Sequence, residues 1–410
     1  MATVLLIGTL DTKGLETAFL RDRIRVMGCN TIVLDSGILG EAIGIEADFT
    51  RQVVAEASGN HIDALRNAGT RGKAIEEMLK GVRKLTLDLF EAGRIHGVVS
   101  LGGAEGAVLA ASAMKILPIG FPKLIVSPVA SGHRKFAPFI GTKDVTVMHS
   151  VVDILGLNAV SRDVFDRAAG AITGMAIAYE KSLNNLSEKI SKGSIAVTML
   201  GNTTRPLMRI KPQLEALDME VVIFHANGVG GRAMEELIQA GYFAAVIDYT
   251  LNEVAGVIGG GYHDGGTTRL DAASSIGIPQ VVVPSCLDFA VFGAAHEVPE
   301  KYDGRPIYYH NPEFTLVQLT EKEQLEAAHF IVEKLNKATG QVIVINPMNG
   351  GSVMDNREGG SFWDASITQA RAEIFRSGLS KRIQYHEVDA HINDALFADF
   401  VLEKTRHILV

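Results

Sequence analysis

Short apolar runs alternate along the chain with longer segments in which apolar residues recur at helical spacing. The short runs predict β-strands and the longer segments predict helices, an alternation typical of an α/β fold with a mostly parallel sheet. In the first half we expect strands near 3–8, 31–35, 97–101, 123–127 and 145–148, and helices near 14–27, 71–92, 104–115 and 163–181. In the second half we expect strands near 195–200, 220–225, 244–248, 280–284, 315–319, 342–346 and 383–388, and helices near 321–338 and 393–408.

One strand–loop–helix motif occurs twice: an apolar strand leads into a loop of small residues, and a helix follows. The first copy is the strand 3–6 with the loop 8–14, and the second is the strand 195–200 with the loop 201–204. This duplication predicts two Rossmann-like domains, 1–182 and 193–410, with mostly parallel sheets and a ligand cleft between them. The polar segment 181–193 marks the boundary, and the irregular segment 40–70 is expected to cover a sheet edge as an insertion.

Composition narrows the class of protein. The chain has 410 residues, of which 47% are hydrophobic and 21% charged, as in soluble globular proteins. A formal net charge of −8 argues against a partner with a nucleic-acid backbone. Cys29 and Cys286 lie far apart, which argues against a disulfide framework or a zinc site and favours the cytoplasm. The longest apolar stretches carry acidic residues, and the N-terminus runs straight into a strand, so we expect neither a membrane span nor a signal peptide.

Small-residue loops after strands let backbone N–H groups approach an anion at a helix N-terminus. In the first half the candidate nucleotide-binding residues are Gly8, Thr9, Asp11, Lys13, Gly102, Gly103, Gly106, Gly141 and Thr142. Lys13 is expected to meet a phosphate, and Asp11 and Asp144 are the candidate magnesium ligands. The first loop lacks the order of a Walker A motif, so a tight turn with a solvated lysine remains the alternative.

The second half carries further candidates. Residues 228–233 fit the G-x-G-x-x-G/A pattern, and Asp248 follows 20 residues after Gly228, as in dinucleotide-binding proteins. That loop follows the second strand of its half, so a general phosphate or carboxylate loop is an equal alternative. The candidate nucleotide-binding residues here are Asn202, Gly228, Gly230, Gly231, Arg232 and Gly260, the last in a glycine-dense run. His225 and Asp248 are the candidate catalytic residues, and a structural histidine is the alternative for His225.

Several of these motifs together carry a family resemblance: IGTLDTKGLE at 7–16, LGGAEG at 101–106, GNTTRP at 201–206, FHANGVGGRAMEELI at 224–238 and VIDYTLNEVA at 246–255. With them the chain resembles the Tm-one-like ATP-binding family, which includes the N-terminal inhibitory domain of a plant tobamovirus-resistance protein. The resemblance implies a two-domain Rossmann-like fold that binds ATP with magnesium and forms a homodimer. The plant proteins carry a further barrel resembling phosphoenolpyruvate-processing enzymes, which implies a separate partner of that kind here.

Three functional hypotheses follow from the residues and the resemblance together. The leading one is a cytoplasmic ATP-binding protein that, as an enzyme, performs transfer or ligation on a small acidic metabolite. The second is an NAD-dependent oxidoreductase with Asp248 on a ribose. The third is a non-catalytic sensor or inhibitor module that binds a nucleotide and presents a surface to a partner.

Overall fold

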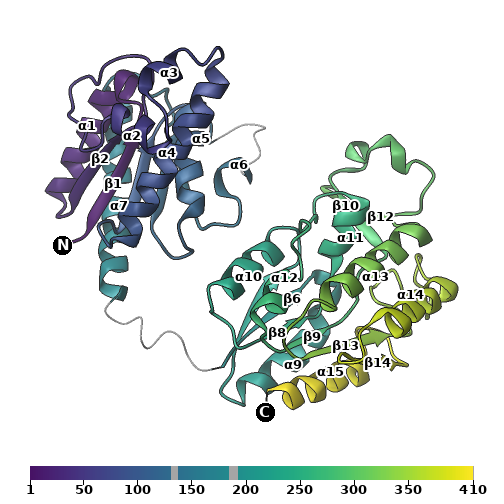
Figure 1. Ribbon diagram of the computed structural model, residues 1–410. Coiled ribbons are helices and arrows are strands. Elements are labelled where there is room, and N and C mark those ends of the chain that lie inside the picture. Colours follow the sequence, from purple (N-terminus) through teal and green to yellow (C-terminus); the bar gives the residue numbers. More distant parts are fainter. Residues whose placement is uncertain (131–136, 184–192, 410) are drawn as a thin grey trace. The chain divides into compact units, whose positions relative to one another are not determined.

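The computed structural model describes residues 1–130, 137–183 and 193–409, and they form an α/β protein (Figure 1). The chain divides into two compact units, Met1–Lys189 and Ile190–Val410. The polar boundary expected at 181–193 falls largely on residues 184–192, which lie outside the described ranges. No helix within the described ranges is long and apolar enough to cross a membrane.

The first unit is built on a five-stranded sheet with the order β2-β1-β3-β4-β5. Every pairing in it is parallel. The strands are β1 (Thr3–Gly8), β2 (Asn30–Asp35), β3 (Gly97–Leu101), β4 (Lys123–Ser127) and β5 (Thr146–His149), which confirms the five expected positions. The strand order reverses between β1 and β3, and in such sheets ligands bind beyond the carboxyl ends of the strands at that point.

Helices cover both faces of this sheet: α1 (Leu10–Val26), α2 (Arg51–Ala57), α3 (Ile62–Arg66), α4 (Arg71–Glu91), α5 (Ala104–Ile116), α6 (Ala137–Ile140) and α7 (Ala159–Leu183). One buried cluster joins α1 and α7 to the sheet, and a second joins α2, α4 and α5 to its other face. The segment 40–70, expected to be irregular, contains α2 and α3. The helix α1 begins at Leu10, but Lys13 within it has non-helical backbone angles (φ −126°, ψ 20°), so the regular part of the helix starts near residue 14, as expected. In its first turn the Leu10 amide donates to the buried Asp35 carboxylate at 3.1 Å.

The second unit has a six-stranded parallel sheet with the order β14-β13-β9-β8-β6-β7. Its strands are β6 (Ser194–Met199), β7 (Glu220–His225), β8 (Ala245–Asp248), β9 (Gln280–Val282), β13 (Val342–Pro347) and β14 (Gln384–Val388). Its helices are α9 (Thr204–Glu215), α10 (Gly230–Gln239), α11 (Asn252–Gly259), α12 (Asp271–Ile276), α13 (Glu321–Leu335), α14 (Ala365–Gly378) and α15 (Ala395–Ile408), with 3₁₀ turns at Gly201–Thr203, Ala295–Glu297 and Glu300–Tyr302.

A small antiparallel sheet is inserted between β9 and β13, with the order β10-β12-β11. Its strands are β10 (Phe289–Phe292), β11 (Ile307–Asn311) and β12 (Phe314–Gln318). The apolar run expected at 315–319 therefore belongs to a hairpin and not to the parallel sheet. The Asn311 side chain closes that hairpin, accepting from the Glu313 and Phe314 amides at 2.9 and 3.0 Å.

A capping box lies at the start of α13. The Thr320 hydroxyl accepts from the Glu323 amide at 3.3 Å, and the Glu323 carboxylate accepts from the Thr320 amide at 2.8 Å. Loss of such a cap leaves helix amides without acceptors.

We expect Thr320→Ala to lower the free energy of unfolding by about 1 kcal/mol, measured by urea denaturation, because one helix-terminal amide loses its acceptor. Thr268→Ala, at an exposed position outside the helices, is the control and should change stability by less than about 0.5 kcal/mol. Equal effects of the two substitutions would contradict the capping role.

Candidate functional site

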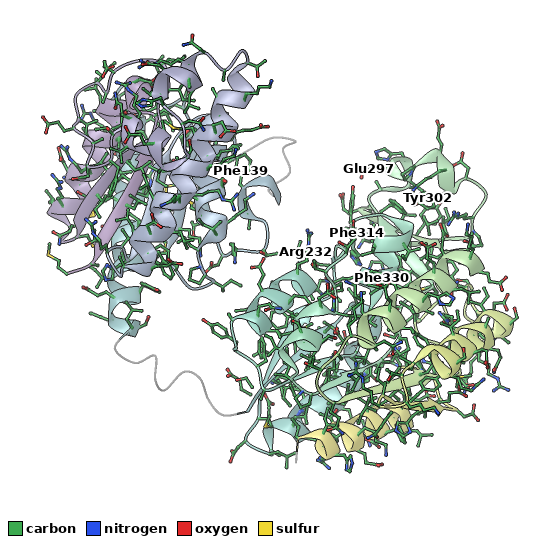
Figure 2. All side chains as sticks on the ribbon, in the orientation of Figure 1. Phe139, Arg232, Glu297, Tyr302, Phe314 and Phe330 are labelled. Atoms are coloured by element: carbon green, nitrogen blue, oxygen red, sulfur yellow. The ribbon has the colours of Figure 1, made fainter. Side chains whose placement is uncertain are left out.

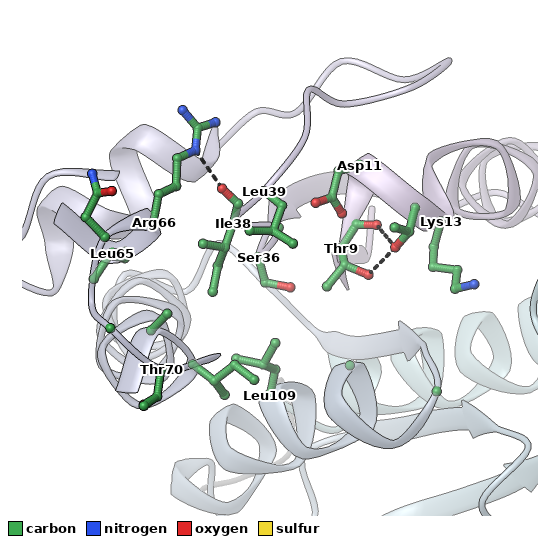
Figure 3. A pocket seen from close by; sticks show the side chains of 18 residues that line it. Thr9, Asp11, Lys13, Ser36, Ile38, Leu39, Leu65, Arg66, Thr70 and Leu109 are labelled. Carbon is green, nitrogen blue, oxygen red and sulfur yellow. Dashed lines mark hydrogen bonds between the residues drawn. The ribbon is translucent and has the colours of Figure 1, made fainter. Parts of the chain in front are cut away.

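A cavity of about 860 Å³ opens at the carboxyl ends of β1, β2 and β3 in the first unit (Figure 3). Four segments line it: the start of α1, the loop after β2, the first turn of α5 and the region from α3 to α4. The lining residues are Thr9, Asp11, Thr12, Lys13, Ser36, Gly37, Ile38, Leu39, Leu65, Arg66, Asn67, Gly69, Thr70, Ala74, Ile75, Gly103, Gly106 and Leu109. The predicted residues Thr9, Asp11, Lys13, Gly103 and Gly106 are thus brought together at one cavity.

The N-terminus of α5 opens into this cavity without a side-chain cap. Its N-cap residue is Gly103, which has no side chain that could cap the helix, and Gly103 and Gly106 both line the cavity. Gly102 permits the tight turn from β3, since a Cβ there would lie 2.9 Å from the Gly106 Cα. The first amides of α5 are therefore positioned to donate hydrogen bonds to an anion.

The N-terminus of α1, by contrast, is satisfied from within the protein. One oxygen of the buried Asp35 carboxylate accepts from the amides of Leu10 and Gly37, at 3.1 and 2.9 Å. Burial raises the pKa of Asp35, and these two amides oppose that shift. Gly8 does not line the cavity, and a Cβ on it would lie 3.0 Å from the Thr17 hydroxyl, so this glycine serves the packing of α1 on β1.

Charged side chains stand on opposite sides of the cavity, with Lys13 on one side and Arg66 on the other (Figure 3). The Lys13 ammonium donates to the Ile154 carbonyl, and the Arg66 Nε donates to the Ile38 carbonyl at 2.9 Å. Asp11 accepts from the Gly40 amide at 3.1 Å. Arg66 was not a sequence candidate, because it lies in the 40–70 insertion, where no motif surrounds it.

The structure corrects the prediction for Asp144, Gly141 and Thr142. These residues precede β5, so they lie at the amino edge of a parallel sheet, whereas Asp11 follows β1 at the carboxyl edge. Asp144 accepts from the buried Lys123 ammonium at 2.7 Å and from the Gly120 amide at 2.8 Å. Asp11 lines the cavity, whereas Asp144 does not.

In the second unit, the glycine loop before α10 already holds a carboxylate. One oxygen of Glu253 accepts from the amides of Gly228 and Gly231, at 2.8 and 2.9 Å. A Cβ on Gly231 would lie 1.8 Å from the other Glu253 oxygen, so glycine is required for this approach. The amides predicted to hold phosphate are occupied by the protein's own anion.

Glu253 belongs to a buried charge cluster around Arg269, whose side chain is fully buried. The Arg269 Nε donates to Glu253 at 2.9 Å, its Nη1 donates to Glu235 and Asp248 at 3.0 Å each, and its Nη2 also donates to Asp248. Glu235 in turn accepts from two amides at the start of α12, Leu270 and Ala272, at 2.7 Å each. Burial raises the pKa of Glu235, an effect that Arg269 opposes.

This cluster also corrects the prediction for Asp248. Its side chain is buried, one oxygen accepts from Arg269 and from the Thr198 hydroxyl at 3.0 Å, and the other accepts from Arg269. Neither oxygen is available to a ribose. The spacing between Gly228 and Asp248, which is typical of dinucleotide-binding proteins, thus places Asp248 in an internal ion pair with Arg269.

The remaining candidates of the second unit lie at or near the carboxyl edge of its sheet. His225 is exposed at the end of the edge strand β7, and a Cβ on Gly230 would lie 2.0 Å from the His225 carbonyl oxygen. Arg232 is exposed on α10 (Figure 2), with its Nε donating to the Gly228 carbonyl at 2.5 Å. Asn202 accepts from the Val353 amide at 3.1 Å. Gly260 follows α11 with a φ of +78°, a conformation that favours glycine.

His263, which the sequence analysis did not select, is held in one tautomer within the glycine-dense run. Its Nδ1 lies 2.7 Å from Asn252 Oδ1, and the Asn252 amide nitrogen donates to the carbonyls of Cys286 and Phe289. Asn252 Oδ1 can therefore only accept, so the His263 Nδ1 carries the hydrogen. Burial, and secondarily His225, lowers the pKa of His263 to about 4, which keeps its imidazole neutral at pH 7. The sequence around His263 contains no motif that would predict a neutral histidine held in one tautomer.

Among the described residues, no group of three or more His, Cys, Asp or Glu side chains could hold a metal ion. A metal ion at the first cavity would rely on Asp11 together with oxygens of a ligand and water, the way in which Mg²⁺ is bound in many nucleotide sites.

Fold and site together define a protein of two parallel α/β units with a cavity at the reversal point of the first sheet. The chain belongs to the uncharacterised protein family UPF0261: the N-terminal domain of that family matches residues 2–181, and the C-terminal domain matches residues 192–409. This membership confirms the resemblance found in the sequence.

The relatives include both bacterial and plant proteins. A UPF0261 protein of Clostridium tetani is 39% identical over 98% of this chain and 97% of its own length. A UPF0261 protein of Rhizobium meliloti is 33% identical over 100% of this chain and 99% of its own length. The ToMV resistance protein Tm-1(GCR237) of Solanum lycopersicum is 35% identical over 99% of this chain, which spans only 56% of that protein.

We expect Arg269→Met to lower the free energy of unfolding by about 3–5 kcal/mol, because it leaves the buried Asp248 and Glu253 and the partly buried Glu235 without their shared cation. Urea denaturation at pH 7.5 measures the effect. Arg232→Met, on the exposed start of α10, is the matched control and should stay within about 0.5 kcal/mol of the parent protein. A small effect at Arg269 would show that the cluster does not stabilise the second unit.

Proposed function

We propose that the protein binds ATP in the cavity of the first unit, with the phosphates at the N-terminus of α5. The observation that carries this proposal is the uncapped first turn of α5, which opens with Gly103 and Gly106 into a cavity of about 860 Å³. Backbone amides and the positive end of a helix dipole are the usual receptors for phosphate groups.

The rest of the lining supports the same ligand. The apolar side chains Ile38, Leu39, Leu65, Ile75 and Leu109 offer a wall for a nucleobase. Lys13 would neutralise phosphate charge after leaving the Ile154 carbonyl, and Asp11 would hold Mg²⁺ together with phosphate oxygens. Bound magnesium would supply charge neutralisation of the phosphates.

The helix starts of the second unit differ from that of α5, and the difference supports placing ATP in the first unit. Two helix starts of the second unit that could hold an anion, those of α10 and α12, are filled by Glu253 and Glu235. The oxidoreductase hypothesis needs a free Asp248 and an open glycine loop, so the geometry favours ATP over NAD. The non-catalytic hypothesis shares the same ATP site and differs only in turnover.

The proposal extends to the reaction, the cellular location and the partners of the protein. As an enzyme it would catalyse transfer or ligation on a small acidic metabolite by positioning and charge stabilisation. The family resemblance implies a cytoplasmic homodimer and a separate partner with a phosphoenolpyruvate-processing barrel. Measuring ATP consumption with and without candidate acids separates the enzyme from the sensor or inhibitor module.

We expect Gly106→Asp to weaken ATP binding about tenfold or more, measured by isothermal titration calorimetry with Mg²⁺, because its carboxylate would meet the phosphates at the start of α5. Gly106→Ala is the matched control and should keep the parent affinity, since a Cβ there meets nothing nearer than the Leu101 carbonyl oxygen at 3.8 Å. Arg232→Ala, in the second unit, should also leave ATP binding unchanged.

Two results would overturn the proposal. One is an unchanged ATP affinity in folded Gly106→Asp, which would remove the phosphates from α5. The other is thermal stabilisation of the parent protein by NAD but not by ATP, since a ligand at about 100 times its dissociation constant adds about 2.7 kcal/mol to stability.

A further inference from the structure

The Ser36 hydroxyl faces the cavity of the first unit without a partner. Ser36 follows β2, and the residue lines the cavity although it is only 2% exposed. Its hydroxyl makes no hydrogen bond to a described residue, and it is not among the unpartnered side-chain atoms that the protein encloses. A nearly buried hydroxyl of this kind depends on the contents of the cavity, a ligand or water, for its hydrogen bond.

Ser100 on β3 differs from Ser36 in one respect. It is also 2% exposed, and its hydroxyl likewise has no partner among the described residues. That hydroxyl is enclosed by the protein, however, and Ser100 does not line the cavity. The two serines therefore share residue type, burial and lack of a partner, and they differ in access to the cavity.

Hydrogen bonds on both sides fix the backbone at Ser36. The Ser36 amide donates to the Gly8 carbonyl at the end of β1 at 2.8 Å, and the Gly37 amide donates to Asp35 Oδ1 at 2.9 Å. A Cβ on Gly37 would lie 2.9 Å from that Asp35 oxygen and 3.1 Å from Asp11 Oδ1, so this close packing requires glycine. A hydroxyl on a fixed backbone loses little conformational freedom when a ligand binds.

Ser36 lies between the apolar and the charged parts of the cavity (Figure 3). On one side, two residues further along the chain, Ile38 begins the apolar wall, and its carbonyl accepts from Arg66 at 2.9 Å. On the other side, Thr9 follows β1, and Lys13 lies one turn later in α1. A ligand that spans the cavity from the apolar wall to Lys13 therefore passes Ser36.

The threonine hydroxyls beside Ser36 are engaged with each other. Thr9 Oγ1 and Thr12 Oγ1 are 3.2 Å apart, and Thr12 Oγ1 lies 3.3 Å from the Thr9 carbonyl oxygen, to which it donates. Thr9 then supplies the hydrogen between the two hydroxyls. Of these three hydroxyls, that of Ser36 is the one whose hydrogen has no described acceptor.

We propose that Ser36 binds the phosphate nearest the nucleoside of ATP and thereby sets the direction of the nucleotide in the cavity. This inference rests on ATP binding in the first unit. The base lies against the apolar wall, the first phosphate accepts from the Ser36 hydroxyl and from amides at the start of α5, and the terminal phosphate points toward Lys13. Neutral donors thus hold the first phosphate, and the lysine charge acts on the distal phosphates.

Isothermal titration calorimetry with AMP, ADP and ATP, each with Mg²⁺, tests this direction. All three nucleotides carry the first phosphate, so Ser36→Ala should weaken each of them by a similar factor of about tenfold. Lys13→Met should weaken ATP about tenfold but AMP less than about twofold, because AMP lacks the phosphates that meet the lysine. Ser100→Ala is the matched control and should keep the parent affinities. Both serine variants remove a hydroxyl without a partner, so both should fold like the parent protein.

Two results with Ser36→Ala would overturn the proposal. One is an unchanged affinity for all three nucleotides, and the other is a loss confined to ATP, which would place the terminal phosphate at Ser36. A measurement without any variant gives a further test: the parent protein should bind AMP at least about tenfold more tightly than adenosine, and equal affinities would also overturn the proposal. If the parent protein binds ATP and Ser36→Ala matches it, only the direction of the nucleotide is wrong. Absence of ATP binding by the parent protein would instead contradict the proposed function itself.

Discussion

The structure depends on one constraint: its main sheets are parallel, so every strand must be followed by a crossover, and the carboxyl ends of the strands gather on one edge. Helices that start at this edge present amides without intrahelical acceptors. A folded chain must supply acceptors for these amides or leave them to solvent and ligands. The chemistry of both units follows from how each helix start meets this requirement.

Carboxylates distant in the sequence meet it at the starts of α1, α10 and α12. Asp35 serves the start of α1, Glu253 serves the glycine loop before α10, and Glu235 serves the start of α12. The start of α5 has no such group among the described residues, and it faces the cavity of the first unit. Two glycine loops of similar sequence character therefore differ in their surroundings, because Glu253, five residues after the end of β8, folds back onto the loop before α10.

Features that depend on neighbouring residues could be predicted from the sequence, whereas contacts between distant residues could not. Apolar periodicity located both parallel sheets, because strand and helix patterns depend on residues close together in the chain. The role of Asp248 could not be read in the same way, since a carboxylate 20 residues after a glycine loop suits a ribose and an internal arginine equally well. Asp144 was misplaced because loop composition does not say which edge of a sheet a loop occupies. Arg66 and His263 have no motif around them, and their positions follow only from tertiary packing.

The Arg269 cluster also has a consequence for the order in which the second unit assembles. Its ion pairs join residues only 16, 21 and 34 positions apart, so closing them costs little chain entropy. The neighbouring strands β7, β6, β8 and β9 can thus gain their buried charges and helix caps before β13 and β14 are added. These last two strands follow the inserted antiparallel sheet in the sequence. During synthesis, a chain that has only just passed α12 already contains every side chain of this cluster, and the later strands add to a framework whose charges are already paired.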